Sequence, residues 1–86
     1  MFNFTRAALG LEQAAKTLVS GDERMTAHHL GKAERLILKA RLNVNEVRAL
    51  IALYDRVIPA GHQLSGTIPI KQNCDEMKKI LRDYIS

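Results

Sequence analysis

The side chains that most often do chemistry in proteins are few in this sequence and are poorly spaced for it. The histidines are His28, His29 and His62, and the one cysteine is Cys74. Neighbouring side chains on a helix diverge by about 100°, whereas two histidines that share a zinc ion on a helix lie four residues apart. The adjacent pair His28-His29 has the wrong spacing, so we expect no metal site.

Nucleophilic catalysis requires an activated serine or cysteine beside a base and an orienting group. The segment Ser65-Gly66-Thr67 consists of turn-forming residues without a nucleophile-elbow motif, and Cys74 falls on the apolar stripe of an expected helix. The sequence contains neither of the usual glycine-rich phosphate-binding motifs. We therefore expect a protein that is not an enzyme and that binds no cofactor.

Two acidic pairs, Asp22-Glu23 and Asp75-Glu76, could in principle carry acid–base chemistry. Both are expected near the beginning of a helix, where carboxylates stabilise the positive end of the helix dipole. This structural role is the preferred explanation, and paired acid–base catalysis is the weaker one.

A row of basic side chains is the best candidate for a binding surface. Its members are separated by four, three and four residues, which places them on one face of a helix. Such a row could contact a phosphate backbone or an acidic partner. The alternative is a solvated helix face, because Glu34 and Glu46 dilute the positive field. The row consists of His28, Lys32, Arg35 and Lys39, and Arg41 and Arg48 follow close by.

The residues 35–51 resemble the helix-turn-helix of transcriptional regulators. The turn is Leu42-Asn43-Val44-Asn45, in which Asn43 can take the left-handed position usually given to glycine. The resemblance implies that the second helix reads DNA, with Asn45 and Arg48 contacting bases or phosphates. A dimeric DNA-binding regulator is therefore one hypothesis. A structural helical hairpin without any groove contact is the alternative.

Hydrophobic periodicity predicts four helices that position these groups. Apolar residues recur at steps of three and four over about residues 5–19, 22–43, 43–58 and 69–84. Asn43 and Glu46 have the spacing of a capping box, and Ser20-Gly21 is typical of a helix end. The residues 59–68 lose the period and are predicted to form a loop. With no alternating strand pattern, we expect an all-α fold of helical hairpins or a small bundle.

Two glycines interrupt this pattern. Gly10 is the weak point of the first helix. Gly31 would cost about 1 kcal/mol relative to alanine inside the second helix. Gly31 therefore indicates either close approach by a neighbouring backbone or a helix that begins nearer Lys32.

Size and composition indicate one small domain over residues 1–86. A chain of 86 residues with 47% hydrophobic residues can bury one modest core. The net charge of +4 is compatible with nucleic-acid or acidic protein partners. A single cysteine favours a reducing compartment, so we expect a cytoplasmic protein. The longest apolar run, Ala49–Tyr54, is too short to cross a membrane, and no membrane partner is expected.

The sequence has more large apolar side chains than one thin core readily covers. Leu36, Ile37 and Leu38 are consecutive and together span about 200° of a helix. A central helix that touches neighbours on two sides could bury all three, which is the alternative to a partner chain. The leading hypothesis is a small interaction protein that self-associates and binds another protein, as an inhibitor or adaptor in gene control. The expected interface residues are Leu36, Leu38, Leu53, Phe2 and Phe4, with the loop 59–68 as a second candidate surface.

Overall fold

The computed structural model describes residues 2–58 and 68–85 of the chain. These residues form four helices and no strand, which confirms the predicted all-α class. The loop predicted over residues 59–68 lies outside the described residues except for Ile68, which begins the last helix. The helices are α1 (Asn3–Val19), α2 (Glu23–Lys39), α3 (Val44–Val57) and α4 (Ile68–Tyr84).

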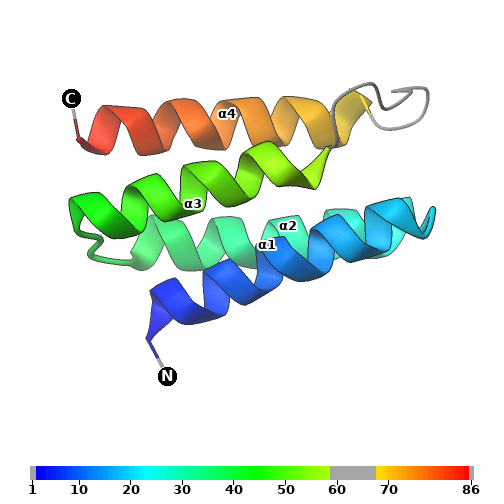
Figure 1. Ribbon diagram of the computed structural model, residues 1–86, viewed down its shortest axis with the longest axis horizontal. Coiled ribbons are helices and arrows are strands. Elements are labelled where there is room, and N and C mark those ends of the chain that lie inside the picture. The colour runs from blue at the N-terminus through cyan, green and yellow to red at the C-terminus, as the bar shows by residue number, and fades with distance from the viewer. Residues whose placement is uncertain (1, 59–67, 86) are drawn as a thin grey trace.

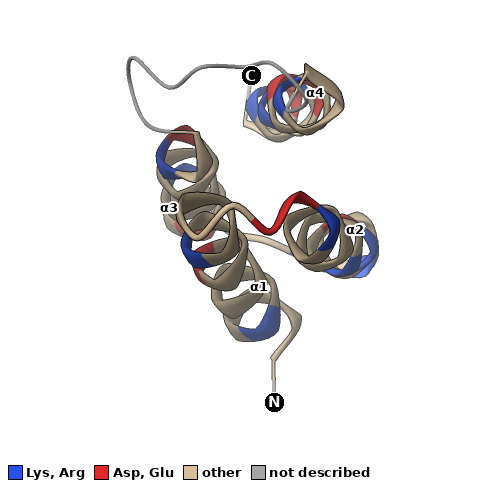
Figure 2. Ribbon diagram, turned by 90° about the vertical axis from the view of Figure 1, so that its right-hand side faces the viewer, with Lys and Arg blue, Asp and Glu red and all other residues tan. Residues whose placement is uncertain are grey.

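Successive helices run in opposite directions, and the first and last described residues lie at the same end of the bundle (Figure 1). Seen end-on, the helices occupy four corners (Figure 2). α1 packs against α2 and α3, and α4 packs against the same two helices. α2 and α3 follow one another in the chain but occupy opposite corners. Their short connection therefore crosses the end of the bundle.

The turn between α1 and α2 is fixed by a glycine and an aspartate. Gly21 has a φ of 85°, which a glycine adopts without a steric penalty. The Gly21 amide donates to the Leu18 carbonyl at 3.0 Å, and the Asp22 amide donates to the Thr17 carbonyl at 2.8 Å. This is a Schellman motif. The Asp22 carboxylate then accepts a bond from the Met25 amide at 3.0 Å, which begins α2 as predicted.

The capping box at the start of α3 is confirmed. The Glu46 amide donates to the Asn43 side-chain oxygen at 2.8 Å, and the Asn43 amide donates to the Glu46 carboxylate at 3.1 Å. α2 ends earlier than predicted, at Lys39, because Ala40 is extended and buried. An extended Ala40 redirects the chain toward the opposite corner, so the helix cannot continue to Leu42.

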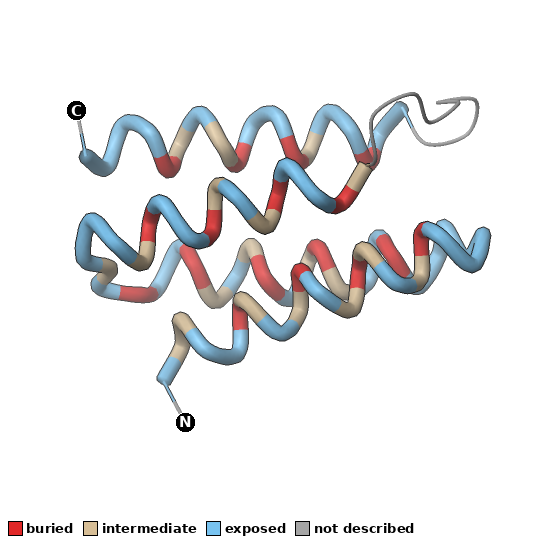
Figure 3. The backbone as a smooth tube through the Cα atoms, in the orientation of Figure 1, coloured by how far each residue is buried: buried red, intermediate tan, exposed pale blue. Residues whose placement is uncertain are grey.

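A single core lies between the four helices (Figure 3). Each helix buries residues spaced by three and four, as the periodicity predicts. The buried side chains are Ala7, Leu11, Ala14 and Leu18 from α1, Leu30, Ala33 and Ile37 from α2, Val47, Leu50, Tyr54 and Val57 from α3, and Ile70, Cys74, Met77 and Leu81 from α4.

Gly10 marks the close approach of α1 to α2. A β-carbon placed on Gly10 would lie 3.5 Å from the Ala33 β-carbon and 3.5 Å from the His29 carbonyl oxygen. Both expectations for Gly31 were wrong. Gly31 lies within α2, and among the described residues a β-carbon placed on Gly31 would have within 4 Å only an atom of the Arg35 side chain of the same helix.

Candidate functional site

The predicted basic row lies on the outward side of α2. His28, Lys32, Arg35 and Lys39 are all exposed, and Figure 2 shows the blue segments of α2 on its outer surface. Arg41, Asn45 and Arg48 are also exposed, beyond the end of α2. The structure therefore brings the α2 row together as one cationic face.

The turn does not have the helix-turn-helix conformation that the resemblance implies. Asn43 has a φ of −86° and a ψ of 170°, so it is extended, and no described non-glycine residue has a positive φ. The left-handed Asn43 was therefore a wrong expectation, because the side chain caps α3 instead. The two helices of a helix-turn-helix pack together, whereas α2 and α3 lie on opposite corners.

The expected interface residues lie in three different environments. Ile37 is buried, Leu36 is half-buried against the core, and Leu38 is 58% exposed. Leu53 and Phe4 are half-buried against the core, whereas Phe2 is 83% exposed. The leucines of α2 and α3 do not share a surface, because these helices are on opposite corners. Leu38 and Phe2 are therefore the two expected residues that are most accessible.

A groove with a volume of about 220 Å³ runs between α1 and α2, and we call it the α1–α2 groove. At its base Gly10 and Leu36 are partly buried, as are Gln13 and His29, whereas Arg6, Leu9 and Lys32 are exposed at its edges. Three of its residues are basic types and none is acidic. The lining residues are Arg6, Leu9, Gly10, Gln13, His29, Lys32 and Leu36. This groove was not predicted from the sequence, although Leu9 offered a signal because it is a large apolar residue outside the buried stripe of α1.

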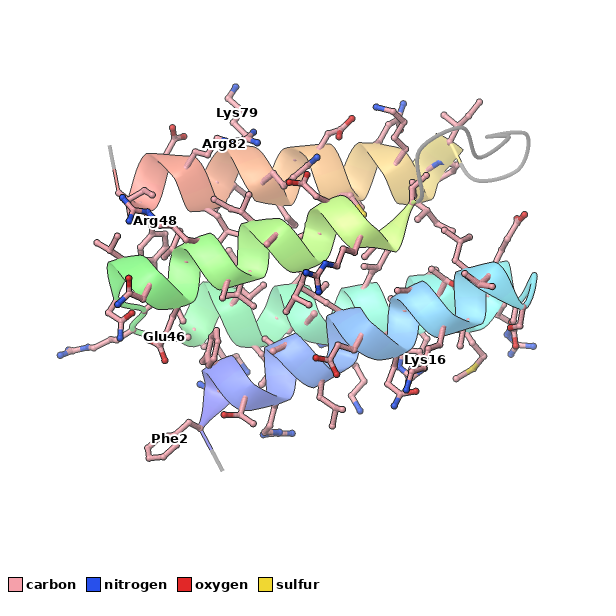
Figure 4. All side chains as sticks on the ribbon, viewed as in Figure 1. Phe2, Lys16, Glu46, Arg48, Lys79 and Arg82 are labelled. Atoms are coloured by element: carbon pink, nitrogen blue, oxygen red, sulfur yellow. The ribbon has the colours of Figure 1, made fainter. Side chains whose placement is uncertain are left out.

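A second apolar surface covers the end of the bundle where the described chain begins and ends, and we call it the terminal face. It contains exposed side chains from all four helices or their flanks. Figure 4 shows Phe2 projecting at the lower edge of this end, Glu46 above it, and Arg48 at the opposite edge beside α4. The exposed members of the terminal face are Phe2, Leu38, Val44, Tyr84 and Ile85.

Ala40 links two members of the terminal face. The Tyr84 hydroxyl donates to the Ala40 carbonyl at 3.2 Å, which joins the end of α4 to the end of α2. A hollow of about 240 Å³ beside Ala40 is lined by Phe2 and Phe4 and by the charged residues Lys39, Arg41 and Glu46. The exposed apolar side chains therefore gather at this end with charged side chains among them. Sequence reasoning found two of its members but missed Val44, Tyr84 and Ile85, which come together only through the fold.

The two most perturbed titrating groups belong to the core. Burial raises the pKa of Cys74 to about 11, with Asp75 adding to the rise and Lys78 opposing it. Burial also raises the pKa of the Tyr54 hydroxyl, with smaller effects from Cys74 and Glu34. The Tyr54 hydroxyl is buried without a hydrogen-bond partner in the structure. Both groups are protonated at neutral pH, so neither is prepared to act as a base or nucleophile.

The expected position of one acidic pair was wrong. Asp75 and Glu76 lie in the middle of α4, not near its beginning, because the helix already starts at Ile68. Asp75 pairs with Lys71 at 2.6 Å and with Lys78 at 3.6 Å. Its hydrogen bond with Lys71 is the main cause that lowers the pKa of the Asp75 carboxyl. The pair is thus part of a surface ion network.

The described residues contain no group of three or more histidine, cysteine or acidic side chains arranged to hold a metal ion. His28 and His29 contact each other edge to face, with ring centroids 5.6 Å apart. His62 lies outside the described residues.

None of the helices in the described part of the chain combines the length and apolar content needed to cross a bilayer. Comparison with protein-family models, curated proteins and solved structures gave no match.

Proposed function

We propose that this protein acts by binding protein chains, including a second copy of itself, and performs no reaction. The terminal face is the observation that supports this proposal. Nine described large apolar side chains are exposed, and five of them gather at this one end. Single exposed apolar residues are ordinary on a protein surface, whereas several exposed large apolar side chains at one end are typical of an interaction site.

A second copy is the occupant that we assign to the terminal face. Most small homo-oligomers are symmetric dimers, in which the same surface of each subunit forms the contact. The terminal face carries apolar side chains together with both basic and acidic ones, Lys39, Arg41 and Glu46, so it can be complementary to its own copy. Burying the Phe2 ring alone would contribute about 1.5–3 kcal/mol to such a contact.

Sedimentation velocity from micromolar to millimolar concentration tests self-association. The wild-type chain is expected to sediment increasingly above its monomer mass of 9.6 kDa. Leu38→Glu and Phe2→Ser should each shift the equilibrium to monomer while the circular dichroism of the helices stays unchanged. Val19→Ser is the matched control, because Val19 is 75% exposed at the opposite end. A wild-type chain that stays monomeric throughout this range refutes self-association.

Nucleic-acid binding is the alternative function, and the exposed basic row of α2 supports it. We do not assign base reading to Asn45 and Arg48, since α2 and α3 lack the helix-turn-helix arrangement. Backbone-phosphate contacts would make affinity fall steeply with salt. A mobility-shift assay with duplex DNA at increasing salt concentration therefore tests this alternative. Strong binding at low salt that Arg35→Ala weakens would favour nucleic-acid binding. The absence of binding at low salt would exclude it.

A further inference from the structure

We propose that the α1–α2 groove binds an acidic amphipathic helix of a partner protein. One apolar side chain of that helix would lie on the groove base, and its carboxylates would lie against the basic edges. This inference rests on the proposed function in protein binding, to which it adds a surface and the chemistry of the partner.

The dimensions of the groove suit part of a larger ligand. Its volume of about 220 Å³ is below the roughly 300–1,000 Å³ typical of small-molecule sites. Along α1 the lining extends from Arg6 to Gln13, and along α2 from His29 to Leu36. At a rise of about 1.5 Å per residue, each side is about 10 Å long, which corresponds to two helical turns. A two-turn stretch of a partner helix matches this length.

The base of the groove is suited to an apolar side chain. Leu36 is half-buried there, and Gly10 has no side chain that would fill the base. Leu9, which is 50% exposed, adds apolar surface at the edge, so a partner side chain could cover apolar surface on both helices. Contacts to a phosphate backbone use cations and hydrogen-bond donors and gain nothing from an exposed leucine. The base therefore favours a protein partner over a nucleic acid.

The edges of the groove select for negative charge. The close approach of Gly10 to His29 and Ala33 sets the antiparallel register of the two helices. In this register Arg6 lies toward one end of the groove, Lys32 near its middle and His29 toward the other end. Basic side chains spaced over two turns match acidic residues at steps of three or four on a bound helix.

Acidic residues of the same two helices do not neutralise the groove edges. The Glu34 carboxylate accepts a bond from the Asn73 side-chain nitrogen of α4 at 2.9 Å, on another side of α2. Asp22 caps the first turn of α2. Glu23 also lies in that first turn, and neither it nor Glu12, which is three residues from Leu9 on α1, is part of the lining. The positive charge of the groove is therefore available to a partner.

Fluorescence anisotropy with three synthetic peptides tests the inference. The first peptide carries leucines at steps of three and four with flanking glutamates, and it is stapled because short helices are marginal in water. The second replaces each glutamate with lysine, and the third replaces each leucine with alanine. The protein used is the Leu38→Glu variant. The charge that this substitution places on the terminal face should keep the protein monomeric and discourage peptides from binding there. We expect it to bind the first peptide at least about tenfold more tightly than the other two, a difference of about 1.4 kcal/mol.

Substitutions in the groove assign the site. Arg6→Glu and Lys32→Glu should each raise the Kd of the acidic peptide roughly three- to tenfold, because each removes an attraction and adds a repulsion. Leu9→Ser should raise it to a similar degree. Lys79→Glu is the matched control: it makes the same charge change on α4, which does not line the groove and where Lys79 is exposed (Figure 4), and it should leave the Kd nearly unchanged.

Three outcomes would overturn the inference: equal binding of the acidic and basic peptides, an effect of Lys79→Glu as large as that of Lys32→Glu, or displacement of the acidic peptide by duplex DNA. A wild-type chain that self-associates yet binds none of the peptides refutes the groove alone. Peptide binding by a chain that never self-associates refutes the terminal face alone.

Discussion

The hydroxyl oxygens of Thr17 and Thr26 lie 2.7 Å apart and form a hydrogen bond between α1 and α2. Thr26 is fully buried. Its hydroxyl also lies 2.8 Å from the Asp22 carbonyl, and the Thr17 hydroxyl lies 3.1 Å from the Ala14 carbonyl. The pair therefore joins the two helices next to the turn that connects them.

Removing both hydroxyls of this pair should cost less than the sum of the two single removals. Thr26→Val is expected to lower the free energy of unfolding by about 1–2 kcal/mol, because the Asp22 carbonyl and Thr17 each lose a partner. The double variant Thr17→Val/Thr26→Val should lose less than the sum of the two single variants. Urea unfolding of all four proteins measures the coupling. Strict additivity would show that the hydroxyl contact contributes nothing.

Tyr54→Phe should leave stability unchanged or raise it by up to about 1 kcal/mol. The Tyr54 hydroxyl is buried without a partner, so its removal avoids a desolvation cost while the ring still fills the core. Tyr54→Ala is the control and should lose about 3–5 kcal/mol from the cavity that it leaves. A loss above about 1 kcal/mol for Tyr54→Phe in thermal or urea unfolding would contradict this reading of the hydroxyl.

Two glycine substitutions should change stability in opposite directions. At Gly10 a β-carbon would meet its neighbours at ordinary contact distance, so Gly10→Ala should gain about 0.5–1 kcal/mol through helix propensity. At Gly21 the φ of 85° disfavours any side chain, so Gly21→Ala should lose about 1 kcal/mol. Thermal unfolding compares the two. A destabilising Gly10→Ala would mean that the helices cannot tolerate even one methyl group at this approach.

Alkaline pH should destabilise the fold through Cys74. Its pKa is raised from 9.0 to about 11 on folding, so the folded state disfavours the thiolate. This contribution is fully present below pH 9 and is lost as the pH rises through about 11. The Tyr54 hydroxyl, whose pKa is also raised, acts in the same direction. Cys74→Ala should therefore make the free energy of unfolding fall less steeply over this range, as urea titrations at each pH would show. An unchanged slope would contradict the assignment to Cys74.

Local chemistry in the sequence predicted the elements well. The apolar stripes and the signals at Gly21, Asp22 and Asn43 are properties of neighbouring residues, and they gave the four helices with small errors at their ends. The end of α2 was missed because an extended Ala40 depends on where α3 must pack. The sequence also misplaced Asp75, which was expected near the beginning of a helix. Asp75 instead pairs with Lys78 on the same helix, and Lys78 also pairs with Asp55 of α3.

The candidate surfaces could be predicted only in part. The basic row follows from the period of one helix, so the sequence was sufficient for it. The α1–α2 groove and the terminal face depend on which helices become neighbours and on the register between them. Leu36, Leu38 and Leu53 look equivalent as surplus leucines in the sequence. The way α2 and α3 pack on their neighbours makes Leu36 a groove residue, leaves Leu38 exposed and places Leu53 beside the core.

Because Phe2 and Ile85 lie at the same end of the bundle, any affinity tag or fluorescent fusion at either terminus will crowd the terminal face (Figure 1). Tagged versions would then under-report self-association and would make a dimer look like a monomer. A dye attached through Val19→Cys, at the far end, avoids this interference, since the native Cys74 is buried and slow to react.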